Sequence, residues 1–152
     1  MLKNNKKGFT LLEVIVVIII LGVLAALALP RLFSNIEFSR SAEALNSISA
    51  VRQSVERCSA MRGNDYTGCD VFSGNVGATL DVTNPGVEAG AHFDYTVDIT
   101  GGGTGDYSVV ATRNALDGGT VTDTITLTVD QNLPATGGTI TRAGTGAFGS
   151  IQ

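Results

Sequence analysis

The sequence predicts an α+β protein in which a long N-terminal helix packs on a small antiparallel β-sheet. Three observations favour this fold class. An apolar stretch fills residues 9–29, an amphipathic helical pattern follows it over 30–62, and short segments of alternating polarity occur within residues 93–141. At 152 residues the chain has room for one domain of ordinary size beside an apolar anchor.

The apolar stretch 9–29 has the length and composition of a membrane-spanning helix. Its only charged residue is Glu13. As a helix it would extend roughly 32 Å, which is enough to cross a hydrocarbon core of about 30 Å. Residues 14–20 are all β-branched and poor helix formers in water, but lipid forces the backbone to satisfy its own hydrogen bonds.

Glu13 is unusual because a carboxylate inside a membrane is costly unless it is paired. It could lie near the membrane edge and reach the interface. Alternatively, cleavage of the chain after Gly8 would create a new α-amino group on Phe9. Phe9 and Glu13 are at positions i and i+4, so they would lie on the same helix face. Glu13 could then pair with its own amine or with the amine of a neighbouring subunit, which would make it an assembly signal.

Residues 30–62 are predicted to continue the helix with one apolar stripe. Pro30 should bend or loosen the helix, because proline removes a backbone donor and clashes one turn back. Gly63 is a suitable residue to end the helix. The stripe consists of residues spaced three and four apart, namely Leu45, Ile48, Val51, Val55 and Cys58.

The two cysteines, Cys58 and Cys69, are close in sequence and follow a segment typical of exported proteins. Both features favour a disulfide, which would stabilise a loop of this size by about 3 kcal/mol in the chain-entropy treatment. The alternative is a pair of buried free thiols.

The sheet is predicted from alternating segments. Residues 93–99 place Phe93 and Ile99 on one face, residues 107–112 form a second strand, and residues 121–129 alternate well only from Ile125 onward. Residues 138–142 could add a short last strand. The Gly-rich 101–105 segment and Asn84-Pro85-Gly86 indicate turns, and 63–92 reads as the loop that connects helix and sheet.

Charge separates the leader from the rest of the chain. The formal net charge is −4, and all three lysines lie before Gly8. Without them, seven arginines remain against fourteen Asp and Glu, which gives −7; from Gly63 onward the charge is −8, with ten acidic residues against Arg113 and Arg142. Such a surface argues against nucleic-acid binding. The basic leader predicts a cytoplasmic N-terminus and a domain on the opposite side of the membrane.

No arrangement of residues indicates catalysis, a cofactor or a metal. Gly144–Gly149 fits G-x-G-x-x-G by letter, but no strand–turn–helix unit surrounds it, so we expect a flexible tail. Asp117, Asp123 and Asp130 could offer oxygens to Ca²⁺, although their spacing matches no calcium loop. We therefore expect neither an enzyme nor a resident cofactor or metal.

The N-terminal residues resemble the class III signal of type IV pilins and type II secretion pseudopilins. A lysine-rich leader precedes Gly8, then Phe9-Thr10-Leu11-Leu12-Glu13 and an apolar run that ends at Pro30. The resemblance implies cleavage between Gly8 and Phe9 by a prepilin peptidase, N-methylation of Phe9, a role for Glu13 in subunit registry and a helix kink at Pro30. Some major pseudopilins also carry a calcium site in the part of the fold where Asp117, Asp123 and Asp130 would lie.

An ordinary secretory signal is the rival interpretation. A basic start, an apolar region and Ala26-Leu27-Ala28 satisfy its description. However, Glu13 is unusual within such a region, and the apolar stretch is longer than the usual ~7–15 residues.

The resemblance implies four segments: a leader at 1–8, a transmembrane and filament-core helix at 9–29, an amphipathic half at 30–62 and an exported globular domain at 63–152. The implied function is that of a structural subunit of a type IV pilus-like filament. The implied partners are other copies and related pilins, the peptidase and an inner-membrane assembly platform. The subunit would cross the inner membrane once, with a periplasmic domain, and then enter an extracellular or periplasmic filament. The alternative is a minor pilin that acts at a filament tip in adhesion or DNA uptake.

Overall fold

The computed structural model describes residues 8–100, 105–131 and 139–151, with the side chains of residues 30, 31, 33, 34 and 117 left aside. Residues 1–7 of the predicted leader, most of the predicted turn 101–105 and Gly138 lie outside this part of the chain. The chain divides into two units, Met1–Ile36 and Glu37–Gln152, and each is described by itself.

One helix, α1, extends over Leu11–Met61 and contributes to both units. The two predicted helical halves are confirmed, and the helical backbone continues through Pro30. The predicted bend at Pro30 stays a prediction. The helix ends as expected, because Gly63 and Asn64 adopt φ angles of 70° and 67° and the Asn64 N–H donates to the Ser59 carbonyl at 2.9 Å.

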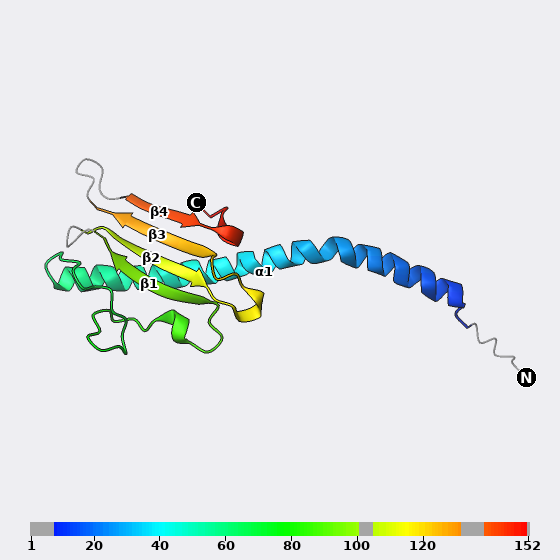
Figure 1. Ribbon diagram of the computed structural model, residues 1–152, viewed down its shortest axis with the longest axis horizontal. Coiled ribbons are helices and arrows are strands. Elements are labelled where there is room, and N and C mark those ends of the chain that lie inside the picture. Colours follow the sequence, from blue (N-terminus) through cyan, green and yellow to red (C-terminus); the bar gives the residue numbers. More distant parts are fainter. Residues whose placement is uncertain (1–7, 101–104, 132–138, 152) are drawn as a thin grey trace, which may run out of the picture. The chain divides into compact units, whose positions relative to one another are not determined.

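The second unit contains a four-stranded antiparallel sheet in the order β1-β2-β3-β4 (Figure 1). The strands are β1 (Phe93–Ile99), β2 (Tyr107–Arg113), β3 (Thr124–Asp130) and β4 (Thr139–Gly144). Three short 3₁₀ helices accompany them: η1 (Pro85–Val87), η2 (Leu116–Gly118) and η3 (Gly146–Phe148). The α+β prediction and the antiparallel meander are both confirmed.

The third strand begins later than its sequence pattern indicated. The Asp123 N–H donates to the Thr120 carbonyl at 3.0 Å, so a turn occupies the residues that precede Thr124. This turn explains why the alternation failed at Asp123, which does not belong to the strand.

The core lies between the α1 stripe and one face of β1, β2 and β3. Ile48, Val51 and Val55 are fully buried, and Leu45 is partly buried against the same cluster. The buried sheet residues alternate along each strand as predicted, and they are Phe93, Tyr95, Tyr107, Val109, Ala111, Ile125, Leu127 and Val129.

The flexible tail expected at Gly144–Gly149 is wrong. These residues include η3, and Phe148 is buried in the core with its ring centroid 5.5 Å from that of Phe93. The close approach requires Gly144, because a Cβ at this position would collide with the backbone of Phe148. The Asp123 carboxylate also accepts a hydrogen bond from the Ala147 N–H at 3.2 Å, so the tail is fixed by both packing and polar contacts.

Candidate assembly surface

The predicted cleavage site lies outside any helix or strand and is accessible. Gly8, Phe9 and Thr10 precede the first residue of α1, and Phe9 is 84% exposed. A Cβ placed on Gly8 would meet no other atom within 4 Å, so nothing in the described chain requires glycine here. A requirement for glycine at this position would therefore have to come from another molecule, such as a peptidase.

Thr10 caps the start of α1. Its Oγ1 accepts a hydrogen bond from the Glu13 N–H at 3.2 Å, and its carbonyl accepts from the Val14 N–H at 3.3 Å. Sequence reasoning missed this role, although Thr-x-x-Glu before an apolar run is the pattern of a capping box. The cap favours a helix that starts at Leu11, one residue after Thr10.

Glu13 lies in the first turn of α1, where a negative charge is favourable to the helix dipole. Its carboxylate makes no hydrogen bond or ion pair with any residue that the structure describes. The pairing with the Phe9 amine stays a prediction, since that amine exists only after cleavage.

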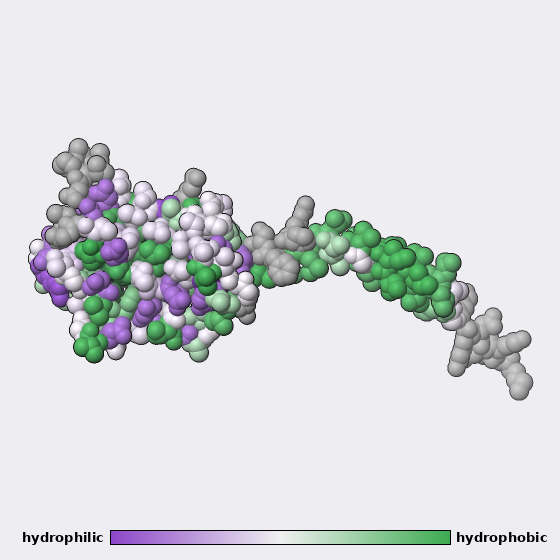
Figure 2. Space-filling view, in the orientation of Figure 1, coloured by the Kyte–Doolittle hydropathy of each residue, from purple (hydrophilic) through white to green (hydrophobic). Residues whose placement is uncertain are grey.

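The helix segment Leu11–Leu29 is apolar on every side and entirely exposed, and we call it the apolar segment. Figure 2 shows it as a continuous hydrophobic surface. It is the one described helix that is long and apolar enough to cross a membrane. A helix that is apolar all round cannot remain in water, so lipid or other protein must cover it.

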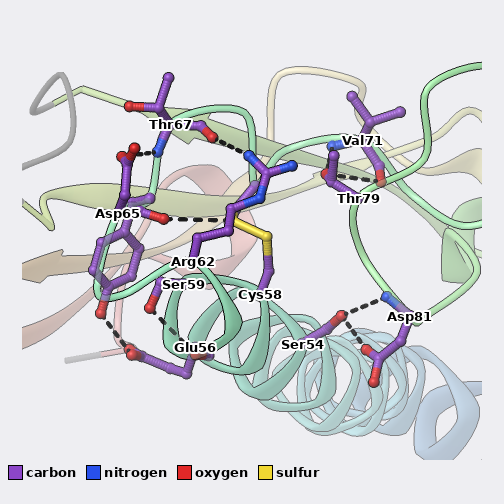
Figure 3. The surroundings of a disulfide bond; sticks show 12 residues. Ser54, Glu56, Cys58, Ser59, Arg62, Asp65, Thr67, Val71, Thr79 and Asp81 are labelled. Carbon is purple, nitrogen blue, oxygen red and sulfur yellow. Dashed lines mark hydrogen bonds between the residues drawn. A yellow bond between two sulfur atoms is a disulfide. The ribbon is translucent and has the colours of Figure 1, made fainter.

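The predicted disulfide between Cys58 and Cys69 is present, with a Cα–Cα distance of 5.9 Å. It joins the last turns of α1 to the loop that follows (Figure 3). Both cysteines are buried, and the Arg62 guanidinium fixes the same loop through the Thr67 carbonyl at 2.5 Å. The bridge therefore connects the loop to the part of α1 that belongs to the second unit, Glu37–Met61, which we call the domain half of α1.

A second polar contact fixes the loop further along the chain. Asp81 accepts hydrogen bonds from Arg57 Nε and Nη2 at 2.7 and 2.8 Å, and from the Ser54 hydroxyl. Arg57 and then Ser54 hold the pKa of Asp81 well below its usual range. Asp81 and Arg57 are both about half exposed, so this pair contributes less than its geometry alone would indicate.

Glu56 connects α1 to the sheet and the loop at once. It accepts hydrogen bonds from the Tyr107 hydroxyl at 2.6 Å and from the Tyr66 hydroxyl at 2.7 Å. Gln131 donates to the Tyr66 hydroxyl at 2.7 Å. Burial and the nearby Glu56 carboxylate raise the pKa of Tyr107. The role of Glu56 depends on tertiary contacts that no periodicity of the sequence reveals.

Arg113 makes a comparable connection at the end of β2. The side chain is 1% exposed, with Nη1 donating to the His92 carbonyl at 3.0 Å and Nη2 to the Leu116 carbonyl at 3.0 Å. Its Nε lies 3.5 Å from Glu37 Oε2 on α1. From the sequence, Arg113 contributed only to the net charge; in the structure it is a buried residue that connects β2 to neighbouring segments.

The described residues contain no cluster of three His, Cys, Asp or Glu side chains that could hold a metal ion. Of the carboxylates considered for calcium, Asp123 binds the Ala147 N–H, and the side chain of Asp117 is not described. The main feature with functional potential is therefore the apolar segment, together with the accessible residues that precede it.

Comparisons with known proteins agree with this geometry. Residues 3–29 match the family described as the prokaryotic N-terminal methylation motif. The chain is 45% identical over 56 residues to type II secretion system core protein G of Aeromonas hydrophila, an alignment that covers 37% of this chain and 39% of that protein.

Two fimbrial proteins match over a longer range. The fimbrial protein of Moraxella nonliquefaciens is 34% identical over 105 residues, which cover 60% of this chain and 68% of that protein. The type IV major fimbrial protein FimA of Dichelobacter nodosus is 30% identical over 104 residues, which cover 63% and 66%. No solved structure gave a significant match.

A methylation motif, an exposed apolar helix and a sheet packed on the same helix define a pilin-like structural subunit. The chain belongs to the family of type IV pilins and type II secretion pseudopilins. Members of this family are structural proteins and not enzymes.

Proposed function

We propose that this chain is a subunit that is cut between Gly8 and Phe9, methylated on Phe9 and polymerised through α1 into a type IV pilus-like filament. The observation that carries the proposal is the apolar segment, which is exposed on all sides and bears a single charge at Glu13. In the membrane, lipid covers this surface. In a filament, the same surface packs against the apolar segments of other subunits.

Cleavage supplies the missing partner of Glu13. The Phe9 amine would lie one turn before Glu13, and the cap at Thr10 would keep the helix start in place after the leader is lost. A carboxylate in lipid is costly until it is paired, so an amine from a neighbouring subunit would favour one register of assembly. The peptidase and an inner-membrane platform are the partners that this route requires, with the N-terminus cytoplasmic and the domain periplasmic before assembly.

The proposal predicts that Glu13→Ala inserts into the membrane and is cleaved but gives at least tenfold less filament than wild type. Sheared filaments are weighed, and membrane fractions are probed for the processed subunit. Thr10→Ala is the matched control, because it removes the cap of the same turn and leaves the carboxylate. Normal filament yield from Glu13→Ala would contradict the registry role.

Gly8→Ala tests the cleavage position separately. Because an added Cβ at Gly8 meets no described atom within 4 Å, the domain should fold normally while the leader is retained. Complete processing of this variant would contradict the assignment.

A subunit of the shaft should dominate the sheared fraction, whereas a tip adhesin would be nearly absent from it.

A further inference from the structure

The two edges of the sheet are protected differently. At the β1 edge, the Asn84 side chain donates to the Tyr95 carbonyl at 3.1 Å, and η1 follows directly. Gly86 approaches so closely that a Cβ there would lie 2.9 Å from the Phe93 carbonyl. At the β4 edge, no described residue hydrogen-bonds to the outer side of the strand. An uncovered edge of this kind favours contact with another chain.

The inner face of β4 is also uncovered. Ile140 pairs with Val129, and Arg142 pairs with Leu127. Val129 and Leu127 are 3% and 2% exposed, whereas Ile140 is 45% exposed. The α1 stripe therefore covers β3 and stops short of β4. We call the exposed pair Ile140 and Arg142 the β4 ledge.

Charge distinguishes the β4 ledge from the rest of the domain. From Gly63 onward the chain contains no lysine and two arginines, against ten acidic residues. Arg113 is buried, so Arg142 is the one exposed cation of this region. Arg142 makes no hydrogen bond or ion pair with any residue that the structure describes.

The opposite edge carries the complementary features. Val87 is 72% exposed at the end of η1, and Glu88 follows it on the surface. The Glu88 carboxylate has no partner among the described residues. We call this pair the η1 ledge. Figure 1 shows η1 beside β1, with β4 at the far edge of the sheet.

We propose that the β4 ledge of one copy binds the η1 ledge of the next, with Ile140 against Val87 and Arg142 paired with Glu88. The inference rests on the proposed function and specifies how neighbouring domains meet. The contact joins two different surfaces, so each subunit can bind a partner on both sides, as an open helical array requires. It also offsets repulsion between domains that each carry an excess of acidic residues.

Charge reversal tests the ion pair in the full-length chain. Arg142→Glu and Glu88→Arg should each lower the yield of sheared filament about two- to five-fold in low salt, the range expected for one exposed ion pair, and the double variant should restore it. Asp94→Arg is the matched control for rescue, because it makes the same charge change on an exposed residue of β1. Rescue of Arg142→Glu by Asp94→Arg, or no rescue by Glu88→Arg, would overturn the pairing.

Cross-linking tests the geometry. Filaments of an Ile140→Cys and Val87→Cys double variant, oxidised before denaturation without reductant, should give a ladder of dimers, trimers and longer chains. Each single variant should stay monomeric. A product that stops at dimers would indicate a closed contact and overturn the head-to-tail arrangement.

The ledge contact and the proposed function can be refuted by different results. If wild type and Arg142→Glu give equal filament yields, the ledge contact is refuted while the filament assignment stands. If wild type is cleaved but forms no filament under any condition, the proposed function itself is refuted, and the ledge contact with it.

Discussion

The two ends of α1 contrast sharply in what covers their apolar side chains. In the domain half, Ala44, Ile48, Val51 and Val55 are fully buried by the sheet and the loop of their own chain. In the apolar segment, every side chain is exposed, with Ile18 59% exposed. Folding of the chain buries the apolar side chains of the domain half. Those of the apolar segment must be buried by lipid or by neighbouring subunits.

The residue patterns account for this contrast. The domain half has one apolar stripe with polar residues on the remaining surface, so a single sheet can bury that stripe. The apolar segment has no polar side, so contact with one partner would leave part of its apolar surface exposed. Mutations in the two halves should therefore affect different properties: domain stability in one and assembly in the other.

The largest expected effect comes from a matched pair of isoleucines. Ile48→Ala should lower the free energy of unfolding of the domain by about 2–5 kcal/mol, because it leaves a cavity in the core. Ile18→Ala should leave that free energy unchanged and reduce only filament yield. Urea denaturation of the detergent-solubilised protein, followed by tyrosine fluorescence, measures the first property. Equal losses of domain stability in both variants would contradict the division.

Loss of the disulfide should have a similar or slightly smaller effect. Cys58→Ser with Cys69→Ser should destabilise the domain by about 3 kcal/mol, because the bridge no longer restricts the unfolded chain. Membrane insertion and leader cleavage should proceed normally, since the bridge lies in the domain half of α1. Reduction of wild type with dithiothreitol is the control, and it should give the same unfolding midpoint. An unchanged midpoint in both cases would contradict a stabilising role for the bridge.

The smallest expected effect is the pH dependence of the Asp81 contact. Because Arg57 and Ser54 lower the pKa of Asp81 in the folded state, the contact stabilises the domain above the unfolded pKa of about 4. This contribution should be lost as the pH falls below that value. The unfolding midpoints of wild type and Asp81→Asn should differ at pH 7, and the difference should narrow progressively as the pH falls below about 4. A difference that does not change with pH would show that the charge of Asp81 is irrelevant.

Local patterns predicted most of the fold. The helix extent, its apolar stripe, the faces of β1 and the disulfide followed from periodicity and from cysteine spacing. These features depend on residues that are close in sequence. The capping role of Thr10 could also have been predicted from Thr-x-x-Glu.

The missed features all depend on contacts between distant residues. Phe148 was assigned to a flexible tail because no strand–turn–helix unit surrounds Gly144–Gly149, yet its ring packs on Phe93. Glu56 was given no role and Arg113 was counted only in the net charge, yet each binds groups from separate elements. No alternation or spacing distinguishes such residues from solvated ones before the fold is known.

The central claim is tested most directly by the intact mass of the subunit in sheared filaments, measured with and without reductant. The account predicts a chain that begins at Phe9, carries one added methyl group and gains two hydrogens on reduction of the Cys58–Cys69 bridge. This result would show that the apolar segment enters the filament with a free N-terminus one turn from Glu13. A full-length chain in the filament, or a chain that begins near Leu29, would contradict the account, because either would remove the amine or the apolar segment on which assembly depends.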